Sequence, residues 1–319
     1  MTAYAIEPTR HSSAFEPPTS VANAIEDFRI HLLTFDRLLP RSVHTYSYHL
    51  RQLLVALPAS AITGDITPTQ LRHWISDEED RGVAPATLRV QCYALRAYYR
   101  WLTHIGYTGP CPLDHVRPPR RVSVERTDYT PPQADAILDH AKNFAQAETA
   151  SRREQFEYAL LATLRYTGVR RTELLELETA QLDLDKRRLR VMGKGQKVRT
   201  VPLPPVYVEI MQWYLTEVRP YLPTSNMLFA NPRAQQNHRG GMAEKSIEPI
   251  TYKHANAVEI DGPHHPHRWR HTYATHLLRQ GVDVHMVQKL LGHANINTTV
   301  IYLHLMVHDL QDSVDRAFG

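Results

Sequence analysis

The chain has 319 residues, of which 42% are hydrophobic and 22% charged, a composition typical of a globular protein long enough for two domains. Its two cysteines are too few for a disulfide framework, which favours a reducing cytoplasm, and no apolar run approaches the roughly 20 residues that span a bilayer. The net charge of +4, from 37 Lys and Arg against 33 Asp and Glu, is weak support for a nucleic-acid partner. The distribution of charge along the chain is more informative about such a partner than the total.

The first third of the chain predicts a small helical domain over residues 19–108. Residues 1–18 are polar, lack the apolar core of a signal peptide and are expected to be a flexible lead-in. Apolar residues then recur at helical spacing in four segments, which predicts four amphipathic helices. The third of these begins at a clear start signal, in which Thr67 is the N-cap, Pro68 lies in the first turn and Gln70 completes a capping box.

Residues 109–129 are predicted to be a linker, because prolines are closely spaced there and apolar residues are few. The segment carries the arginines Arg117, Arg120 and Arg121. These side chains either follow a DNA backbone between two domains or simply keep an ordinary linker solvated. The sequence favours neither explanation over the other.

The remainder, residues 130–319, is predicted to be a second domain that is mainly helical. Residues 156–166 form a strongly apolar helical segment. Further on, Leu189 and Val191 alternate with polar residues ahead of Gly193-Lys194-Gly195, which predicts a hairpin with a glycine-rich turn. The predicted fold class is therefore mainly α with a small β-hairpin or sheet, with an α+β domain following a helical one.

The hairpin region concentrates positive charge. Between Lys186 and Arg199 there are seven basic residues and no acidic one. Such a local field attracts phosphates, although a solvated basic hairpin is the alternative explanation. Lys194 lies between two glycines and is expected to reach outward from the sheet, unless it only keeps the turn soluble. The residues of this region predicted to bind DNA are Arg188, Arg190, Lys197 and Arg199.

Two predicted helix starts carry arginines in positions suited to an anion. Thr167-Gly168-Val169-Arg170 follows a helix end, and an arginine at the start of the next helix adds a fork of donors to a site that already favours anions. Glu173, one turn later, either holds Arg170 in position or forms an ordinary structural salt bridge with it. In the second start, the three-residue spacing puts His267 and Arg270 on one helix face.

The histidines near this second helix start are not predicted to bind a metal. His267 and His271 have the i, i+4 spacing of a zinc-binding pair, but the zincin pattern requires Glu directly after the first histidine, and Arg268 stands there. Neighbouring arginines oppose a cation, and no carboxylate ligand is evident in the sequence. We therefore expect no metal ion and no other cofactor.

Five short motifs in a fixed order resemble those of the tyrosine recombinases, the family of phage integrases, Xer-type chromosome resolvases and transposon-borne relatives. The motifs are Thr-Gly-Val-Arg-x-x-Glu-Leu, the Gly-Lys-Gly hairpin followed by Val-Pro-Leu, Pro-His-x-x-Arg-His with Ala-Thr-His-Leu-Leu after it, Leu-Leu-Gly-His, and Thr-Thr-x-x-Tyr. Each motif alone is weak, but five in this order and spacing are specific. The resemblance is strong over residues 158–304 and covers the first domain only as a helical shape.

The resemblance implies a role for each matching residue. Arg170 and Arg270 would grip the scissile phosphate, and Glu173 would support the first of these arginines. The other implied catalytic residues are Lys194 on the hairpin, the histidines His267 and His293, and the nucleophile Tyr302. There are two departures from the family pattern, Trp269 in place of the usual leucine and Arg171 as an extra charge, and neither removes a catalytic group.

The resemblance further implies a site-specific DNA recombinase that cleaves and rejoins strands through a 3′-phosphotyrosine, without ATP or metal, in the integration, excision or resolution of DNA elements. A helical core-binding domain and a catalytic domain would clamp the double-stranded recombination site. Four protomers would assemble as a tetramer on two sites, joined partly by residues 307–318. Two other functions stay open: a type IB topoisomerase-like relaxase with the same residues, and a DNA-binding relative that has lost catalysis.

Overall fold

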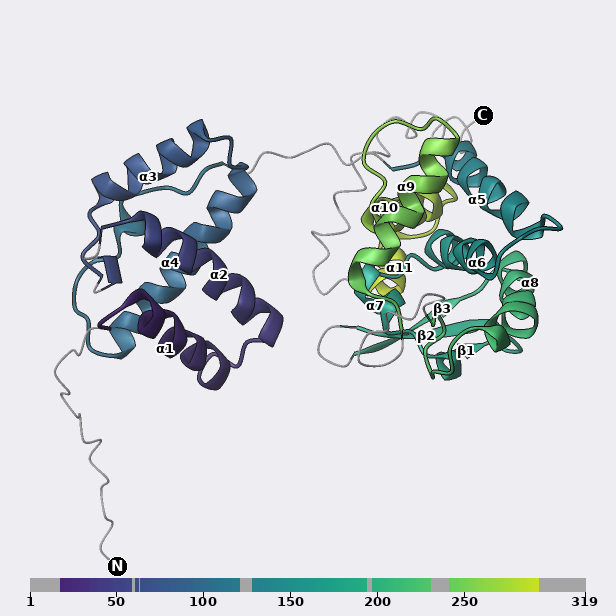
Figure 1. Ribbon diagram of the computed structural model, residues 1–319, viewed down its shortest axis with the longest axis horizontal. Coiled ribbons are helices and arrows are strands. Elements are labelled where there is room, and N and C mark those ends of the chain that lie inside the picture. Colours follow the sequence, from purple (N-terminus) through teal and green to yellow (C-terminus); the bar gives the residue numbers. More distant parts are fainter. Residues whose placement is uncertain are drawn as a thin grey trace, which may run out of the picture. The chain divides into compact units, whose positions relative to one another are not determined.

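The computed structural model describes residues 18–58, 61–62, 64–120, 128–193, 197–230 and 241–292. The chain divides into two compact units, residues 1–124 and residues 125–319 (Figure 1). Each unit has its own hydrophobic core. The described part is mostly helical and holds a three-stranded sheet in the second unit, which confirms the predicted fold class. None of the described helices is both long enough and apolar enough to cross a membrane.

The first unit is built on four helices, as predicted. These are α1 (Val21–Thr34), α2 (Pro40–Ala56), α3 (Pro68–Asp80) and α4 (Pro85–His104). The start signal of α3 is confirmed, because the Gln70 backbone N–H donates to Thr67 Oγ1 at 3.2 Å and the Thr67 N–H donates to Gln70 Oε1 at 2.9 Å. Cys92, Leu95 and Tyr98 of α4 are fully buried, so α4 lies at the centre of this unit's core.

Part of the proline-rich segment belongs to the first unit rather than to a connecting stretch. Leu113 and Val116 are buried in the core of that unit, in and beside the short helix η2 (Pro112–Asp114). Arg96 Nη2 of α4 donates to the Leu113 carbonyl oxygen at 3.1 Å. The segment predicted to be a linker therefore holds folded structure at its start, because two apolar residues three positions apart anchor it.

The second unit is arranged around a central helix, α6 (Arg152–Thr167). Residues 156–165 are all buried, as expected for a helix that is enclosed on every side. Helices α5, α8 and α10 pack against α6 (Figure 1). The other helices of the unit are α5 (Pro131–Gln146), α7 (Arg171–Leu175), α8 (Pro205–Trp213), α9 (Ile247–Ala257), α10 (Pro266–Arg279) and α11 (Val284–Leu291), with the short helices η3 (Thr179–Gln181), η5 (Tyr214–Val218), η6 (Arg219–Tyr221) and η7 (Glu244–Ser246).

The sheet is antiparallel, with the strand order β1-β2-β3. Strands β2 (Arg188–Met192) and β3 (Val198–Pro202) form the predicted hairpin. Strand β1 (Leu182–Asp183) pairs with β2 and was not predicted, because two residues are too few to show an alternating pattern.

Alternation along the hairpin separates a buried face from an exposed one. Leu189, Val191 and Val201 are fully buried, whereas Arg190 is exposed. The register pairs Val191 with Arg199, and directly opposed residues share a face. Arg199 therefore points to the buried side of the sheet.

Candidate active site

The turn that ends α6 builds the first part of the site. Gly168 follows Thr167 with a φ of 58°, in the left-handed region that favours glycine. A Cβ at Gly168 would lie 2.3 Å from Tyr273 Cδ1 of α10, so the position leaves no room for a side chain. This close approach brings the turn against α10, and α7 begins directly after it with Arg170 as its N-cap.

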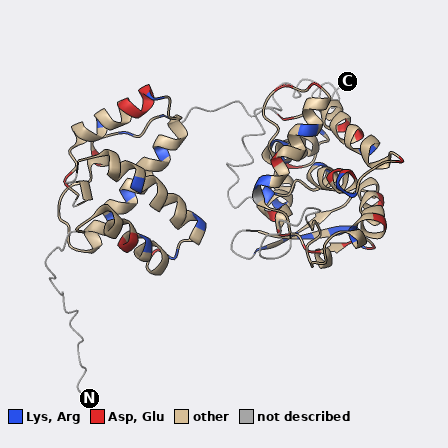
Figure 2. Cartoon of the chain, viewed as in Figure 1, with Lys and Arg blue, Asp and Glu red and all other residues tan. Residues whose placement is uncertain are grey.

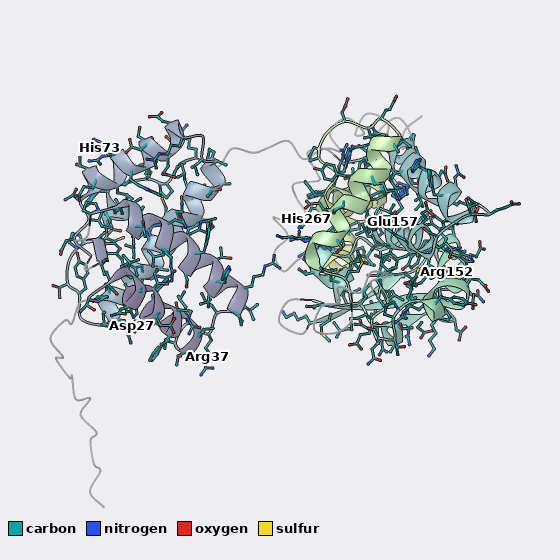
Figure 3. The ribbon with its side chains drawn as sticks, viewed as in Figure 1. Asp27, Arg37, His73, Arg152, Glu157 and His267 are labelled. Carbon is teal, nitrogen blue, oxygen red and sulfur yellow. The ribbon has the colours of Figure 1, made fainter. Side chains whose placement is uncertain are left out.

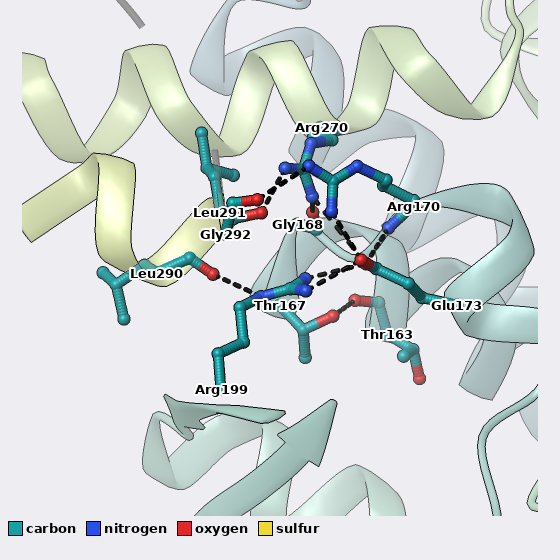
Figure 4. A network of polar contacts seen from close by, with 10 residues as sticks. All are labelled: Thr163, Thr167, Gly168, Arg170, Glu173, Arg199, Arg270, Leu290, Leu291 and Gly292. Carbon is teal, nitrogen blue, oxygen red and sulfur yellow. Dashed lines mark hydrogen bonds and ion pairs between the residues drawn. The ribbon is translucent and has the colours of Figure 1, made fainter. Parts of the chain in front are cut away.

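Glu173 is the centre of the ion pairs in this site (Figure 4). Its side chain is 5% exposed. Arg170 donates to it twice, from the backbone N–H to Oε2 at 2.7 Å and from Nη1 to Oε1 at 2.6 Å. Arg199 Nη1 and Nη2 lie 2.8 and 2.7 Å from Oε1 and Oε2, and Arg270 Nη1 lies 3.9 Å from Oε2. The ion pair of Glu173 with Arg170 that the sequence led us to expect is present, and two further arginines join it.

The arginines keep Glu173 ionised. Burial by itself would raise the pKa of this carboxyl group, but the hydrogen bonds and charge of Arg199, with a further contribution from Arg170, lower the pKa to about 2. The carboxylate therefore carries its charge at neutral pH and holds the positive groups around it.

The end of α11 supplies a second set of acceptors for the same arginines. Three consecutive backbone carbonyls take part, those of Leu290, Leu291 and Gly292. Arg199 Nε lies 2.7 Å from the first oxygen, Arg270 Nη2 binds the second, and Arg170 Nη2 lies 3.0 Å from the third. Carbonyls at a helix C-terminus lack helical donors and carry the negative end of the helix dipole, so they suit arginine.

Arg170 and Arg270 thus converge on one place although they lie far apart in the sequence, and Figure 4 shows their guanidinium groups next to each other. Arg270 is 3% exposed and also donates from Nη1 to the Gly168 carbonyl oxygen at 2.7 Å. Two adjacent guanidinium groups offer paired donors to an anion that carries several oxygens. The geometry therefore suits a phosphate group.

Helix α10 carries His267 one turn before Arg270. The helix is capped by His265, whose Nδ1 accepts a hydrogen bond from the Arg268 N–H at 3.2 Å. His267 is exposed at the surface of the unit (Figure 3), and its ring centre lies 6.4 Å from that of His271. Within the part of the chain that the structure describes, no three His, Cys, Asp or Glu side chains gather as potential metal ligands.

Contacts of Tyr129, which the sequence did not indicate, also fix α10. The Tyr129 backbone N–H donates to Thr272 Oγ1 at 2.9 Å. Its ring packs against Trp269 with ring centres 4.9 Å apart, and the Arg268 guanidinium lies 4.1 Å from the ring centre. Trp269 is fully buried, so its side chain fills core space beside Tyr129.

Tyr273 lies near the same arginines, and its phenol is buried. Burial raises the pKa of its phenol to about 12, although the charges of Arg199 and Arg270 oppose the shift. The phenol therefore stays protonated at neutral pH. The ring of Tyr273 packs against Gly168 and so contributes to the packing of α10 on the turn after α6.

Comparison with known proteins identifies the family. A sequence model described as the phage integrase family matches residues 128–308, and one described as the phage integrase N-terminal SAM-like domain matches residues 25–106. The chain belongs to the phage integrase family. The membership confirms the resemblance drawn from the five motifs.

Relatives of this chain include tyrosine recombinases of the Xer type. Tyrosine recombinase XerC of Pelobacter propionicus is 31% identical over 300 residues, which cover 92% of this chain and 94% of the relative. Tyrosine recombinase XerD of Listeria monocytogenes is 30% identical over 295 residues, which cover 90% of this chain and 96% of the relative. Among solved structures, the XerH site-specific recombinase in a post-cleavage complex with a palindromic difH substrate is similar in fold, with a TM-score of 0.74 at 20% identity, over 92% of this chain and 84% of that one.

Several residues predicted for the active site and DNA contacts of the integrase lie outside the described residues. They are Arg121, Lys194, His293 and Tyr302. The positions next to two of them are described. The Gly193 N–H donates to the Lys197 carbonyl oxygen at 2.8 Å across the base of the hairpin, and Gly292 ends α11 directly before residue 293.

Most of the described residues predicted to bind DNA present positive charge at the surface. Arg190 and Lys197 of the hairpin and Arg120 of the first unit are exposed. Arg188 is 43% exposed, and its Nε lies 3.2 Å from Asp183 Oδ2. Lysines and arginines of the two units are blue in Figure 2.

Arg199, predicted to bind DNA, lies in the interior of the second unit. Its side chain is 9% exposed, and its guanidinium group binds Glu173 and the end of α11 rather than facing solvent. The reason is the alternation of β3, which puts Arg199 on the buried face with Val201. The sequence carries this alternation, but it also carries a run of basic residues that by itself indicates a single charged surface.

Proposed function

We propose that this integrase is a site-specific DNA recombinase that cleaves a strand through Tyr302, holds the broken end as a 3′-phosphotyrosine and then rejoins it. The observation that carries the proposal is the convergence of Arg170 and Arg270 at the end of α11, directly before His293. The match to the phage integrase family extends through residue 302, and relatives at about 30% identity over most of the chain are tyrosine recombinases.

The two arginines suit the reaction at a phosphodiester. Attack on phosphorus places additional negative charge on the nonbridging oxygens, and guanidinium groups stabilise that charge with paired hydrogen bonds. Glu173 and the carbonyls of α11 fix both arginines before DNA binds, so little reorganisation is needed when the charge develops. His293 would give a further donor to the same oxygens.

The remaining residues would transfer protons. A phenol has a pKa near 10, so Tyr302 needs a proton acceptor or strong stabilisation of the transition state, and His267 would assist its deprotonation. Lys194 would protonate the leaving 5′ oxygen. The phosphotyrosine conserves the energy of the broken bond, so rejoining needs neither ATP nor a metal ion.

The partner of the integrase in this proposal is a double-stranded recombination site. Residues 19–108 would bind the core of the site, and residues 130–319 would carry the chemistry. Solved structures similar in fold include a lambda integrase dimer bound to a core site and a Tn1549 integrase in complex with transposon end DNA. Four protomers would join two sites, partly through residues 307–318. The phosphate contacts would come from Arg120, Arg121, Arg188, Arg190 and Lys197.

A nicked suicide duplex tests the proposal, with candidate sites first located by footprinting. Cleavage near the nick releases a short fragment that cannot rejoin, so the protein should remain attached to DNA on a denaturing gel. Strand exchange between two marked duplexes is expected as well. Relaxation of supercoiled DNA without exchange would support a type IB topoisomerase-like relaxase instead, and binding without any adduct would support a catalytically inactive relative.

A further inference from the structure

Arg199 joins three elements of the active site (Figure 4). It lies on β3, the strand that follows the Lys194 hairpin. Its Nη1 and Nη2 bind both oxygens of Glu173 on α7, at 2.8 and 2.7 Å, and its Nε binds the Leu290 carbonyl oxygen at the end of α11, at 2.7 Å. A Cβ at Gly292 would lie 3.0 Å from Arg199 Cδ, so the end of α11 packs closely on this side chain.

These contacts use the planar shape of the guanidinium group. Its three nitrogen atoms donate to a carboxylate and to a carbonyl on different elements, which the single ammonium group of a lysine cannot do. The side chains of Arg199 and Glu173 are 9% and 5% exposed, so water competes little for the bonds. The arrangement therefore depends on the arginine fork as well as on its charge.

Arg199 also occupies both carboxylate oxygens of Glu173, which leaves them less available to Arg170 and Arg270. Glu173 Oε1 binds Arg170 Nη1 at 2.6 Å, while Arg170 Nη2 reaches the end of α11. Arg270 Nη1 stays 3.9 Å from Oε2, beyond a hydrogen bond. If Arg199 were absent, both carboxylate oxygens would be more open to Arg170 and Arg270, and the attraction would shift those guanidinium groups toward Glu173.

We propose that Arg199 is a positioning residue for DNA cleavage. It occupies Glu173 and anchors the end of α11, and it thereby holds Arg170 and Arg270 where a phosphate group binds them. The inference rests on the proposed function. It gives Arg199 no contact with DNA, in contrast to the exposed Arg190 on the neighbouring strand.

The first test compares Arg199→Gln and Arg199→Lys with Arg190→Gln. For both Arg199 variants, cleavage should slow by about 10- to 100-fold, the effect of misplaced catalytic groups, and the loss should remain when all of the DNA is bound. Arg190→Gln should instead weaken DNA binding and reduce the salt slope by about 0.9, the effect of a lost phosphate contact. A cleavage defect in Arg199→Gln that disappears at saturating DNA, or full activity in Arg199→Lys, would overturn the inference.

The second test distinguishes positioning from a general structural role. A methylphosphonate at the scissile position removes the negative charge that Arg170 and Arg270 bind. If Arg199 acts through these arginines, the ratio of wild-type to Arg199→Gln cleavage rates should fall toward one on this substrate. A purely structural defect would slow cleavage of the natural and the methylphosphonate substrate by the same factor, and that result would contradict the inference.

Two further variants separate positioning from loss of folding. Arg199→Gln combined with Glu173→Gln leaves no stranded carboxylate, and its ratio of rates on the two substrates is compared with that of Glu173→Gln alone, so the comparison stays measurable if Arg199→Gln unfolds. Arg219→Gln is the matched control, because Arg219 also binds backbone carbonyls, those of Pro223, Ser225 and Met227, in another part of the second unit. Its thermal midpoint should fall, but its ratio of rates on the two substrates should equal that of the wild type.

Adduct formation by the wild-type chain distinguishes a failure of the proposed function from a failure of the inference about Arg199. If the wild-type chain forms no adduct on any site it binds, the proposed function fails and the inference fails with it. If the wild type cleaves and Arg199→Gln cleaves at the same rate, the inference alone fails.

Discussion

Glu173→Gln removes the negative charge at the centre of the site and keeps the size of the side chain. The three arginine partners differ in exposure, which is 31% for Arg170, 9% for Arg199 and 3% for Arg270. The side chains of Arg199 and Arg270 cannot rotate into solvent, so in Glu173→Gln each stays buried without a counter-ion. Breaking a buried ion pair from one side costs about 3–5 kcal/mol, and we expect the free energy of unfolding to fall by an amount in this range.

Glu157→Gln is the matched variant in the same unit, on α6 (Figure 3). Burial would raise the pKa of Glu157, but hydrogen bonds from His254, Lys253 and Arg153 lower it to about 2, as for Glu173. Here, however, Arg153 and Lys253 are 40% and 42% exposed and are able to turn into water. The amide oxygen still serves His254, so the expected loss is about 1–2 kcal/mol.

Urea unfolding of the full chain is monitored through hydrogen exchange of the α6 amides. This readout gives the unfolding midpoint of both variants in the same part of the molecule. The midpoint should fall clearly further for Glu173→Gln than for Glu157→Gln. Asp183→Asn, which weakens the partly exposed pair with Arg188 and keeps an oxygen for the Lys186 N–H, should change the midpoint little. If Glu157→Gln is as costly as Glu173→Gln, the exposure of the partners does not control the cost, and the reasoning is wrong.

Three further results are expected. The folded-state pKa of Glu157 and of Glu173 is about 2, below the ordinary 4.5, so the stabilisation from these carboxylates is complete above pH 4.5 and is lost as the pH falls toward 2. Urea midpoints should therefore decline over that range, and a flat profile would contradict a stabilising role of the ion pairs. Cleavage should be insensitive to EDTA, since arginines and a lysine supply the positive charge, and activity that vanishes with chelator and returns with a divalent ion would overturn the metal-free mechanism. Lys194→Ala should cleave the natural substrate much more slowly than the wild type. It should regain most of the wild-type rate on a substrate with sulfur in place of the bridging 5′ oxygen, because that leaving group needs no proton. Equal defects on both substrates would make Lys194 a DNA-binding residue only.

Local signals in the sequence predicted much of the fold. The capping box at Thr67 and Gln70 and the alternation of Leu189 and Val191 depend on neighbouring residues, and the structure confirms both. The five motifs led to the family because they are specific in combination. The folded start of the proline-rich segment was missed, because Leu113 is buried by residues far away in the chain, which no local pattern shows.

The site was predictable in its residues but not in its contacts. The sequence named Arg170, Arg270 and Glu173, but it did not show that consecutive carbonyls of α11 would bind the arginines, because every residue type has a carbonyl. Arg199 was assigned to a DNA-binding surface from its charge. The strand alternation, given more weight than the charge run, would have placed it inside.

The central claim is that Tyr302 is the nucleophile, and adduct formation on a nicked suicide duplex tests it most directly. Tyr302→Phe keeps the ring and removes only the reacting oxygen, so it should bind DNA as the wild type does and form no covalent adduct. Tyr273→Phe is the control, because the phenol of Tyr273 is buried with a pKa of about 12, and this variant should still form the adduct. A wild-type level of adduct in Tyr302→Phe would assign the nucleophile to another residue and contradict the account.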